Sequence, residues 1–273
     1  MASLEVKNDI ISGLISMARA NRHFLPGHIW HLTHRCHKRE SLLKFSKDRT
    51  HWMALLFEAK KRYRLSILDF IVTSNHIHLI VCNSSHPDAI PKAMQLIAGR
   101  TGQAYNRRKG RKGAFWEDRY HATAIESGEH LWRCLVYVDL NMVRAGMVNH
   151  PSEWKWSGYH EIQKPKTRYR LIDHDQLRRL LNAGTDEMLA QTHRVWVESQ
   201  LKARPTRQAH FGKSLAVGSE KFIRSVKQSM GIRAVGRRIS KTPTEGYQLK
   251  ESIAEYGSAK SVETYIYPAM PDT

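Results

Sequence analysis

The stretch SILDFIVTSNHIHLIVC, residues Ser66–Cys82, decides the fold. Its two halves, Ser66–Thr73 and His76–Cys82, are rich in the β-branched and aromatic residues that strands favour. Only Ser74 and Asn75 separate them, which is the spacing of a tight connection. We therefore expect two adjacent strands that form a hairpin.

Strands and helices alternate on either side of this hairpin. A strand over Gly27–Cys36 and a helix that Ser46 can cap precede it, and a helix over Pro87–Asn106 and a strand over His121–Ile125 follow it. The order β-α-β-β-α-β predicts an α+β protein with a ferredoxin-like split βαβ arrangement, in which helices cover an antiparallel sheet. One more helix begins near Ser127.

Changes in composition along the sequence divide the 273 residues into unequal parts. We expect an N-terminal extension over residues 1–20 and a main domain over 21–163. After residue 163 the sequence becomes basic and then shows helical segments with few clear start and stop signals. Residues 164–232 are therefore expected to form a mainly helical accessory region. Apolar residues thin out from residue 233, and residues 233–273 are expected to be a basic tail that is flexible or only locally ordered.

The net charge of the chain points to a polyanionic partner. It carries 44 Lys and Arg against 25 Asp and Glu, which gives a formal charge of +19. Nucleic acid is the commonest polyanion, and a membrane surface is the competing one. No apolar run approaches the length of a membrane-spanning helix, so we expect no membrane association.

Cysteine usage and the N-terminal residues bear on the compartment. Cys36, Cys82 and Cys134 are odd in number and widely spaced, which excludes a disulfide framework and a CxxC zinc site. The first twenty residues lack the charged start and unbroken apolar middle of a secretory signal. We therefore expect a reduced, cytoplasmic protein.

Two histidines lie one residue apart at the start of the second strand of the hairpin. Residues i and i+2 of a strand share one face and lie about 7 Å apart, so His76 and His78 can bind one metal ion. Taken alone, an HxH pair is more often two ordinary half-buried histidines. The interpretation as a metal site needs further ligands from elsewhere in the chain.

The helix over Gly128–Gly146 has one polar face. On a wheel at about 100° per residue, apolar residues cover nearly all of its circumference. The narrow window that remains holds Arg133, Tyr137, Asn141 and Arg144, with Cys134 at its edge. The alternative for Tyr137 is a surface tyrosine that packs its ring and keeps its hydroxyl in water.

These residue types suit phosphodiester chemistry. A tyrosine can be a covalent nucleophile, which divides one difficult step into two easier ones. The Asn141 carbonyl oxygen and the imidazoles of His76 and His78 form a ligand set for Mg²⁺ or Mn²⁺, with the nitrogens favouring Mn²⁺. Such a metal would polarise a phosphate that Arg133 and Arg144 hold.

Several motifs together resemble the IS200-like single-tyrosine (Y1) transposases. The histidine, hydrophobe, histidine run His76–His78 resembles the motif of HUH endonucleases, and YVDLNMVRAGMV, Tyr137–Val148, followed by WKWSGYHE, Trp154–Glu161, is similar to the REP-associated tyrosine transposase branch. The runs RHFLPGHIWHLTHRCHKRE and AYNRRKGRKGAFWEDRY resemble the same branch. The resemblance covers about residues 22 to 160, and so makes residues 21–163 the expected catalytic domain with the HUH endonuclease fold.

The resemblance implies a metal-dependent nickase and strand transferase for single-stranded, hairpin-forming DNA. It implies that Tyr137 attacks a phosphate to give a 5′-phosphotyrosine and a free 3′-OH, that His76 and His78 bind the metal, and that Asn141 completes the metal shell. It also implies a bacterial protein that lies with the nucleoid when bound to DNA. Asp139 and Met142 depart from the residues that the family usually has, Glu or His and Pro respectively.

A basic run follows the helix over Pro87–Asn106 and is the main candidate for DNA contact. Positive charge interleaved with aromatic residues suits single strands and unpaired bases. The candidate DNA-binding residues are Arg107, Arg108, Lys109, Arg111, Lys112, Arg119, Arg133 and Arg144. For Arg119 the alternative is an ion pair with Glu117 or Asp118.

Two further groups of residues favour structural roles. His31, His34, Cys36 and His37 are tempting as a zinc cluster, but strand alternation divides them between two faces. Trp154 and Trp156 are expected to pack the junction to the C-terminal region.

Two other functions compete with the transposase interpretation. A ferredoxin-like sheet can bind RNA or DNA without chemistry, although Trp30 and Phe70 form no convincing pair of stacking aromatics on the strands. A domesticated transposase that keeps the site and serves its host is the other. The sequence leaves open whether the chain is a monomer or a homodimer, and whether Tyr137 serves its own subunit or a neighbour's.

Overall fold

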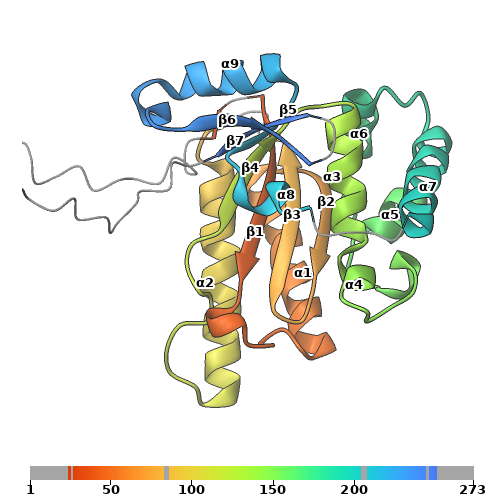
Figure 1. Ribbon diagram of the computed structural model, residues 1–273. Coiled ribbons are helices and arrows are strands. Elements are labelled where there is room, and N and C mark those ends of the chain that lie inside the picture. The colour runs from red at the N-terminus through yellow and green to blue at the C-terminus, as the bar shows by residue number, and fades with distance from the viewer. Residues whose placement is uncertain (1–23, 26, 83–85, 204–207, 244–245, 251–273) are drawn as a thin grey trace, which may run out of the picture.

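The predicted hairpin lies at one edge of a mainly antiparallel sheet. It consists of β2 (Ser66–Val72) and β3 (His76–Cys82), which pair antiparallel. The other side of β3 pairs with β1 (Ile29–Arg35), and β1 pairs with β4 (His121–Ile125). The order β2-β3-β1-β4 and the intervening helices confirm the ferredoxin-like split βαβ arrangement (Figure 1).

Two long helices cover one face of this sheet. The helices α1 (Ser46–Tyr63) and α2 (Ala89–Lys109) pack against each other, and the largest buried side chain of α1 is Trp52. The residue that precedes α1 is Phe45, and no side chain caps the helix, so the expectation that Ser46 is its cap was wrong. Ser46 is instead the first helical residue.

The sheet continues beyond the ferredoxin-like half. The computed structural model describes residues 24–25, 27–82, 86–203, 208–243 and 246–250, and these contain seven strands in the order β2-β3-β1-β4-β5-β7-β6. Of the added strands, β5 (Ala216–Gly218) pairs parallel with β4, and β7 (Tyr247–Lys250) joins β5 to β6 (Arg238–Lys241).

These added strands correct the expectation for the C-terminal part of the chain. The segment from residue 233 onward was expected to be at most locally ordered, yet residues 238–241 and 247–250 are strands of the main sheet. Strands of three or four residues are too short for a period of two to stand out in a sequence. Residues 251–273 and the expected extension over residues 1–20 lie outside the described residues.

The helix that carries the polar window is divided in two. α3 (Glu129–Asp139) and α4 (Asn141–Arg144) flank Leu140, whose backbone angles are φ −78° and ψ 9°. The sequence predicts one continuous helix over Gly128–Gly146, and the structure interrupts it at Leu140. The backbone hydrogen bonds from Leu140 N to Val136 O and from Arg144 N to Leu140 O keep the two pieces nearly in line.

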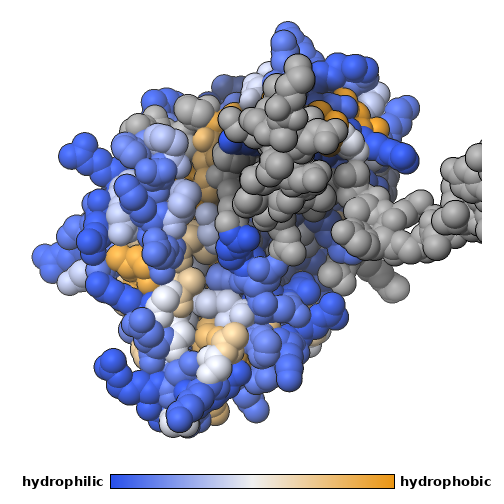
Figure 2. Space-filling view, turned by 90° about the vertical axis from the view of Figure 1, so that its left-hand side faces the viewer, coloured by the Kyte–Doolittle hydropathy of each residue, from blue (hydrophilic) through white to orange (hydrophobic). Residues whose placement is uncertain are grey.

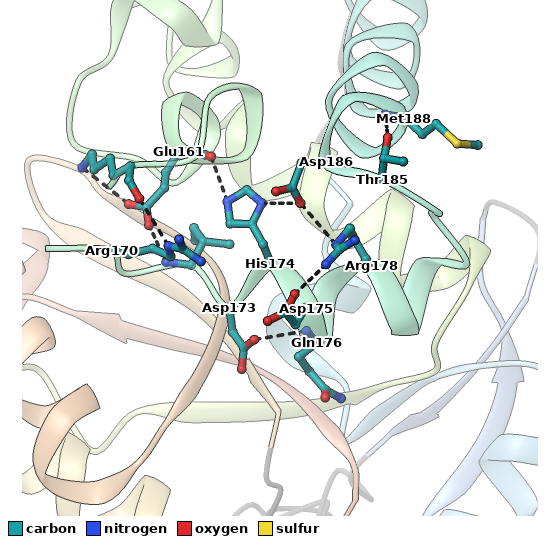
Figure 3. A network of polar contacts seen from close by, with 12 residues as sticks. Glu161, Arg170, Asp173, His174, Asp175, Gln176, Arg178, Thr185, Asp186 and Met188 are labelled. Carbon is teal, nitrogen blue, oxygen red and sulfur yellow. Dashed lines mark hydrogen bonds and ion pairs between the residues drawn. The ribbon is translucent and has the colours of Figure 1, made fainter. Parts of the chain in front are cut away.

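Three more helices pack beside α3. They are α5 (Tyr159–Gln163), α6 (His174–Leu181) and α7 (Asp186–Lys202). Figure 3 shows the buried His174 between them, with Nε2 bonded to the Glu161 carbonyl at 3.0 Å and Nδ1 3.3 Å from Asp186 Oδ1. Arg178 contacts the same Asp186 oxygen at 3.2 Å. This polar network holds α5, α6 and α7 together.

Short elements complete the described chain. They are the helix α8 (His210–Lys213), the helix α9 (Glu220–Met230), and the 3-10 turns η2 (His37–Arg39), η3 (Pro151–Glu153) and η4 (Gly231–Ala234). In Figure 1, α8 and α3 lie in front of the sheet and α1 behind it. None of the helices among the described residues has the length and apolar character needed to cross a membrane.

Candidate active site

The pairing of β1 with β3 gathers three imidazoles on one face of the sheet. Thr33 is paired with His78, and residues two apart on a strand share a face, so His31 lies on the same side as His76 and His78. His31 is fully buried and His78 is nearly so. His31 Nε2 and His78 Nδ1 are 2.8 Å apart, and the ring centroids of His76 and His78 are 5.0 Å apart.

The polar window of α3 and α4 faces these histidines. Asn141 Nδ2 lies 3.0 Å from His78 Nε2. The Tyr137 ring stands edge-on to both buried imidazoles, with centroid distances of 5.8 Å to His78 and 6.1 Å to His31. The structure therefore brings together Tyr137, Asn141 and the histidine pair, as the sequence predicted.

Arg144 contacts Tyr137 twice. Its Nη2 donates to the Tyr137 carbonyl oxygen at 2.7 Å, and its guanidinium carbon lies 4.3 Å from the centroid of the Tyr137 ring. The other predicted arginine of this helix, Arg133, pairs with Glu129 at 2.5 Å. Arg144 thus fixes the backbone and the ring of Tyr137 together.

Burial keeps the inner histidines neutral. It lowers the pKa of His31 to about 4, although the hydrogen bond to the Phe211 carbonyl acts in the opposite direction. Burial, followed by the neighbouring His31 and His76, also holds the pKa of His78 well below its ordinary value. A neutral imidazole has one nitrogen with a lone pair, which is the form that binds a metal.

The surroundings of His76 place its proton on Nδ1. Nδ1 lies 2.7 Å from Asn75 Oδ1, and the Asn75 amide nitrogen donates to the Arg39 carbonyl at 3.2 Å. An amide that donates through nitrogen presents its oxygen as an acceptor, so His76 Nδ1 is a donor and Nε2 carries the lone pair. Hydrogen bonds of this kind commonly orient histidines that bind metals.

The donor set fits a divalent cation of intermediate hardness. Nε2 of His78 points at the Asn141 amide, which could present its oxygen instead of its nitrogen to a cation. Two imidazole nitrogens and an amide oxygen suit Mn²⁺ and Mg²⁺ better than a thiolate-loving metal. Within the described residues, no group of three or more His, Cys, Asp or Glu side chains gathers as a metal site, and the third candidate ligand in this cluster is the Asn141 amide.

The basic run lies at the end of the sheet where β3 begins. Arg107, Arg108 and Lys109 end α2, and Arg111 and Lys112 follow in the loop. Arg108 pairs with Asp48 at 2.5 Å and Arg111 reaches Glu40 at 3.9 Å, which places the run beside the start of α1. Figure 2 views the molecule from the side of α2, where hydrophilic residues make up most of the coloured surface.

Two residues near the basic run make local contacts. Arg119 is exposed, and its backbone N–H bonds Asp118 Oδ1 at 2.7 Å. His34 points away from His31, donates from Nε2 to the Asp118 carbonyl at 2.8 Å, and stacks on Trp116 with centroids 4.0 Å apart.

Trp154 and Trp156 do not pack the junction to the C-terminal region, so this expectation was wrong. Trp154 Nε1 donates to the Val72 carbonyl at 3.0 Å, and Trp156 Nε1 donates to Thr50 Oγ1 at 3.3 Å. The Arg49 guanidinium lies over both rings, at 4.8 and 3.9 Å. They pack against the end of β2 and the start of α1, because residues 156–158 run alongside β2.

Sequence reasoning missed two parts of the site. His31 was assigned a structural role, and only the antiparallel pairing of β1 with β3 would have placed it beside His78. The other is α8, whose Phe211 carbonyl lies 2.7 Å from His31 Nδ1 and whose Phe211 ring lies 5.2 Å from the Tyr137 ring. No motif in the sequence marks Phe211.

Fold and site define a ferredoxin-like protein with a tyrosine, an amide and paired histidines in one cluster. Residues 25–139 match the family model described as "Transposase IS200 like". This match confirms the resemblance of that segment to the IS200-like transposases, and the segment includes His76, His78 and Tyr137. It ends two residues before Asn141.

Two solved structures are similar to this one. One is a REP associates tyrosine transposase bound to a REP hairpin, with 20% identity and a TM-score of 0.44 over 51% of this chain and 81% of that chain. The other is a putative transposase from Deinococcus radiodurans R1, with 14% identity and a TM-score of 0.32 over 45% of this chain and 93% of that chain. No curated protein matches the chain.

Proposed function

We propose that the chain is a metal-dependent single-stranded DNA endonuclease and strand transferase, a transposase that acts on hairpin-forming DNA. One observation carries this proposal: the Tyr137 ring and the Asn141 amide both lie beside His78. The ring centroids of Tyr137 and His78 are 5.8 Å apart, and Asn141 Nδ2 lies 3.0 Å from His78 Nε2. The charge of +19 supports a DNA partner. A purely binding sheet would present aromatics for stacking, and Trp30 and Phe70 are both buried.

Tyr137 would be the nucleophile. Its phenol oxygen forms a bond to the scissile phosphorus while the bond from phosphorus to the 3′ oxygen breaks. The phenol loses its proton and the leaving oxygen gains one, which gives a 5′-phosphotyrosine and a free 3′-OH. Attack by another 3′-OH on the phosphotyrosine would then release Tyr137 and join the strands.

His76, His78 and Asn141 would hold Mg²⁺ or Mn²⁺. When bound, the cation would polarise the scissile phosphate and stabilise its developing negative charge. Arg144 keeps the Tyr137 ring and carbonyl in place through its two contacts, at 4.3 and 2.7 Å. The basic run over residues 107–112 and Arg119 would bind the DNA backbone outside this cluster.

The test is a covalent adduct. The full-length protein is incubated with Mn²⁺ and with labelled single strands that contain the hairpins flanking its gene, and denaturing gels report any adduct. We expect an adduct with wild type, none with Tyr137→Phe, and none after chelation of the metal. Tyr63→Phe on α1 removes the hydroxyl of another half-buried tyrosine and should react like wild type. An equal yield from Tyr137→Phe would refute the assignment of the nucleophile.

The metal assignment has its own test. Asn141→Ala should weaken Mn²⁺ binding, measured by calorimetry or from the electron paramagnetic resonance signal of free Mn²⁺. The exposed Asn149→Ala is the matched control and should bind like wild type. Equal Mn²⁺ affinity of Asn141→Ala and wild type would remove Asn141 from the ligand set.

A further inference from the structure

A chain of hydrogen bonds runs from α8 along one face of the sheet to the candidate metal site. The Phe211 carbonyl oxygen lies 2.7 Å from His31 Nδ1, and His31 Nε2 lies 2.8 Å from His78 Nδ1. The two imidazole planes are only 6° apart. At its far end, His78 Nε2 lies 3.0 Å from the Asn141 amide.

The carbonyl at the start of this chain sets the direction of every bond in it. A carbonyl oxygen only accepts, so His31 Nδ1 carries a proton and donates. His31 is fully buried, and a buried imidazole with one proton accepts through its other nitrogen. His31 Nε2 therefore accepts from His78 Nδ1–H. The lone pair of His78 is consequently on Nε2, the nitrogen that faces Asn141.

The position of the Phe211 carbonyl is itself fixed by the sheet. Thr123 on β4 is paired with His31 and lies on the same face. Its Oγ1 lies 3.1 Å from the Phe211 carbonyl oxygen and 2.7 Å from the Ser214 carbonyl oxygen. Because the hydroxyl has one proton, the two carbonyls share this donor, which ties α8 to β4, and Phe211 is 1% exposed. These contacts come from a segment beyond residues 25–139, the part that matches the transposase family.

We propose that His31 is a positioning residue that holds His78 with its proton on Nδ1 and its metal-binding lone pair on Nε2, and that α8 serves the site by supplying the acceptor for His31. The inference rests on the proposed function, because it assumes that His78 binds a metal. His76 is oriented separately through Asn75, so the two histidines have independent supports. Substitution of His31 should therefore weaken metal binding without abolishing it.

Two substitutions of His31 distinguish its hydrogen bond with the Phe211 carbonyl from its hydrogen bond with His78. His31→Asn places an amide near the position of Nδ1, where it can still donate to the Phe211 carbonyl but leaves His78 Nδ1 without its acceptor. His31→Gln places an amide oxygen near the position of Nε2 and restores that acceptor. We expect His31→Asn to weaken Mn²⁺ binding by about 10- to 100-fold, the range for partners of metal-binding histidines, and His31→Gln to recover most of the loss.

His34→Gln is the matched control. His34 is buried on the same strand and also bonds a backbone carbonyl, that of Asp118, but it lies on the opposite face. Calorimetry of the full-length protein with Mn²⁺ should give wild-type affinity for His34→Gln. Equal Mn²⁺ affinity of His31→Asn, His31→Gln and wild type would overturn the proposal.

Nitrogen-15 NMR of labelled histidines tests the proton positions without any substitution of His31. Spectra of His78→Gln assign the His78 signals, which in wild type should show a protonated Nδ1 and an unprotonated Nε2. A proton on Nε2 of His78 would overturn the proposal even if the His31 variants failed to fold. Wild type with the expected proton positions and no affinity for Mn²⁺ would refute the proposed metal site while supporting the hydrogen-bond chain.

Discussion

Asp139 and His193 form a fully buried contact, with 2.8 Å between Asp139 Oδ2 and His193 Nε2. It joins α3, the helix that carries Tyr137, to α7. Gln163 at the end of α5 donates to the other ring nitrogen of His193 at 2.9 Å. The C-terminal helices therefore support the helix of the candidate nucleophile from the side opposite the histidines.

Substitution of His193 should lower the free energy of unfolding of the protein. His193→Leu leaves the Asp139 carboxylate buried without its partner, which typically lowers the free energy of unfolding by about 3–5 kcal/mol. Urea denaturation followed by circular dichroism measures the change. Glu220→Gln, which breaks the exposed pair with Arg224 on α9, is the control and should change the stability little. Equal stability of His193→Leu and wild type would show that the buried contact contributes nothing.

Substitution of Arg144 should impair the reaction of Tyr137 and spare metal binding. Arg144→Gln loses both contacts that fix Tyr137, and small misplacements of a reacting group cost on the order of 100-fold in rate. Lysine lacks the planar fork that bonds the carbonyl and covers the ring, so Arg144→Lys should not restore the rate. Rates of adduct formation at saturating Mn²⁺ measure the effect, and the exposed Arg168→Gln should react like wild type. A wild-type rate in Arg144→Gln would contradict the positioning role.

The stability of the protein should fall as the pH drops from 6.5 to 4. Burial lowers the pKa of His34 to about 4, so between these values the unfolded chain binds a proton that the folded chain does not. The native state therefore loses stability as the pH falls, by about 3 kcal/mol for this one histidine across the window. His34→Gln keeps a donor for the Asp118 carbonyl and cannot titrate. Urea denaturation at pH 7, 5.5 and 4.5 should show a shallower loss for this variant, and parallel losses would disprove the assignment.

Gly158 should tolerate no side chain. A Cβ at this position would collide with Asp69 Oδ1 and would lie 3.2 Å from both Ile172 Cδ1 and the Phe70 backbone nitrogen. Gly158→Ala should therefore lower the free energy of unfolding by about 1–3 kcal/mol. The matched control is Gly99→Ala in the middle of α2, where a Cβ meets nothing within 4 Å. Alanine there should raise the stability by about 0.5–1 kcal/mol, because glycine is a poor helix former. Thermal unfolding of both variants checks the opposite signs.

The local periodicity of the sequence determined the hairpin, the ferredoxin-like order of elements and the polar window of α3 and α4. Of residues 131–142, only Arg133, Tyr137 and Asn141 are not buried, because a helical period places residues four apart on one face. The same reasoning put His76 and His78 on one face of β3. These patterns span few residues, so the sequence displays them directly.

Only the tertiary structure decided what surrounds these residues. His31 meets His78 through the register of β1 on β3, and Phe211 reaches His31 across 180 positions of the chain. Trp154 and Trp156 pack on α1 and β2, and the short strands β5, β6 and β7 extend the sheet. Such contacts depend on strand register and on long-range packing, which no local period encodes.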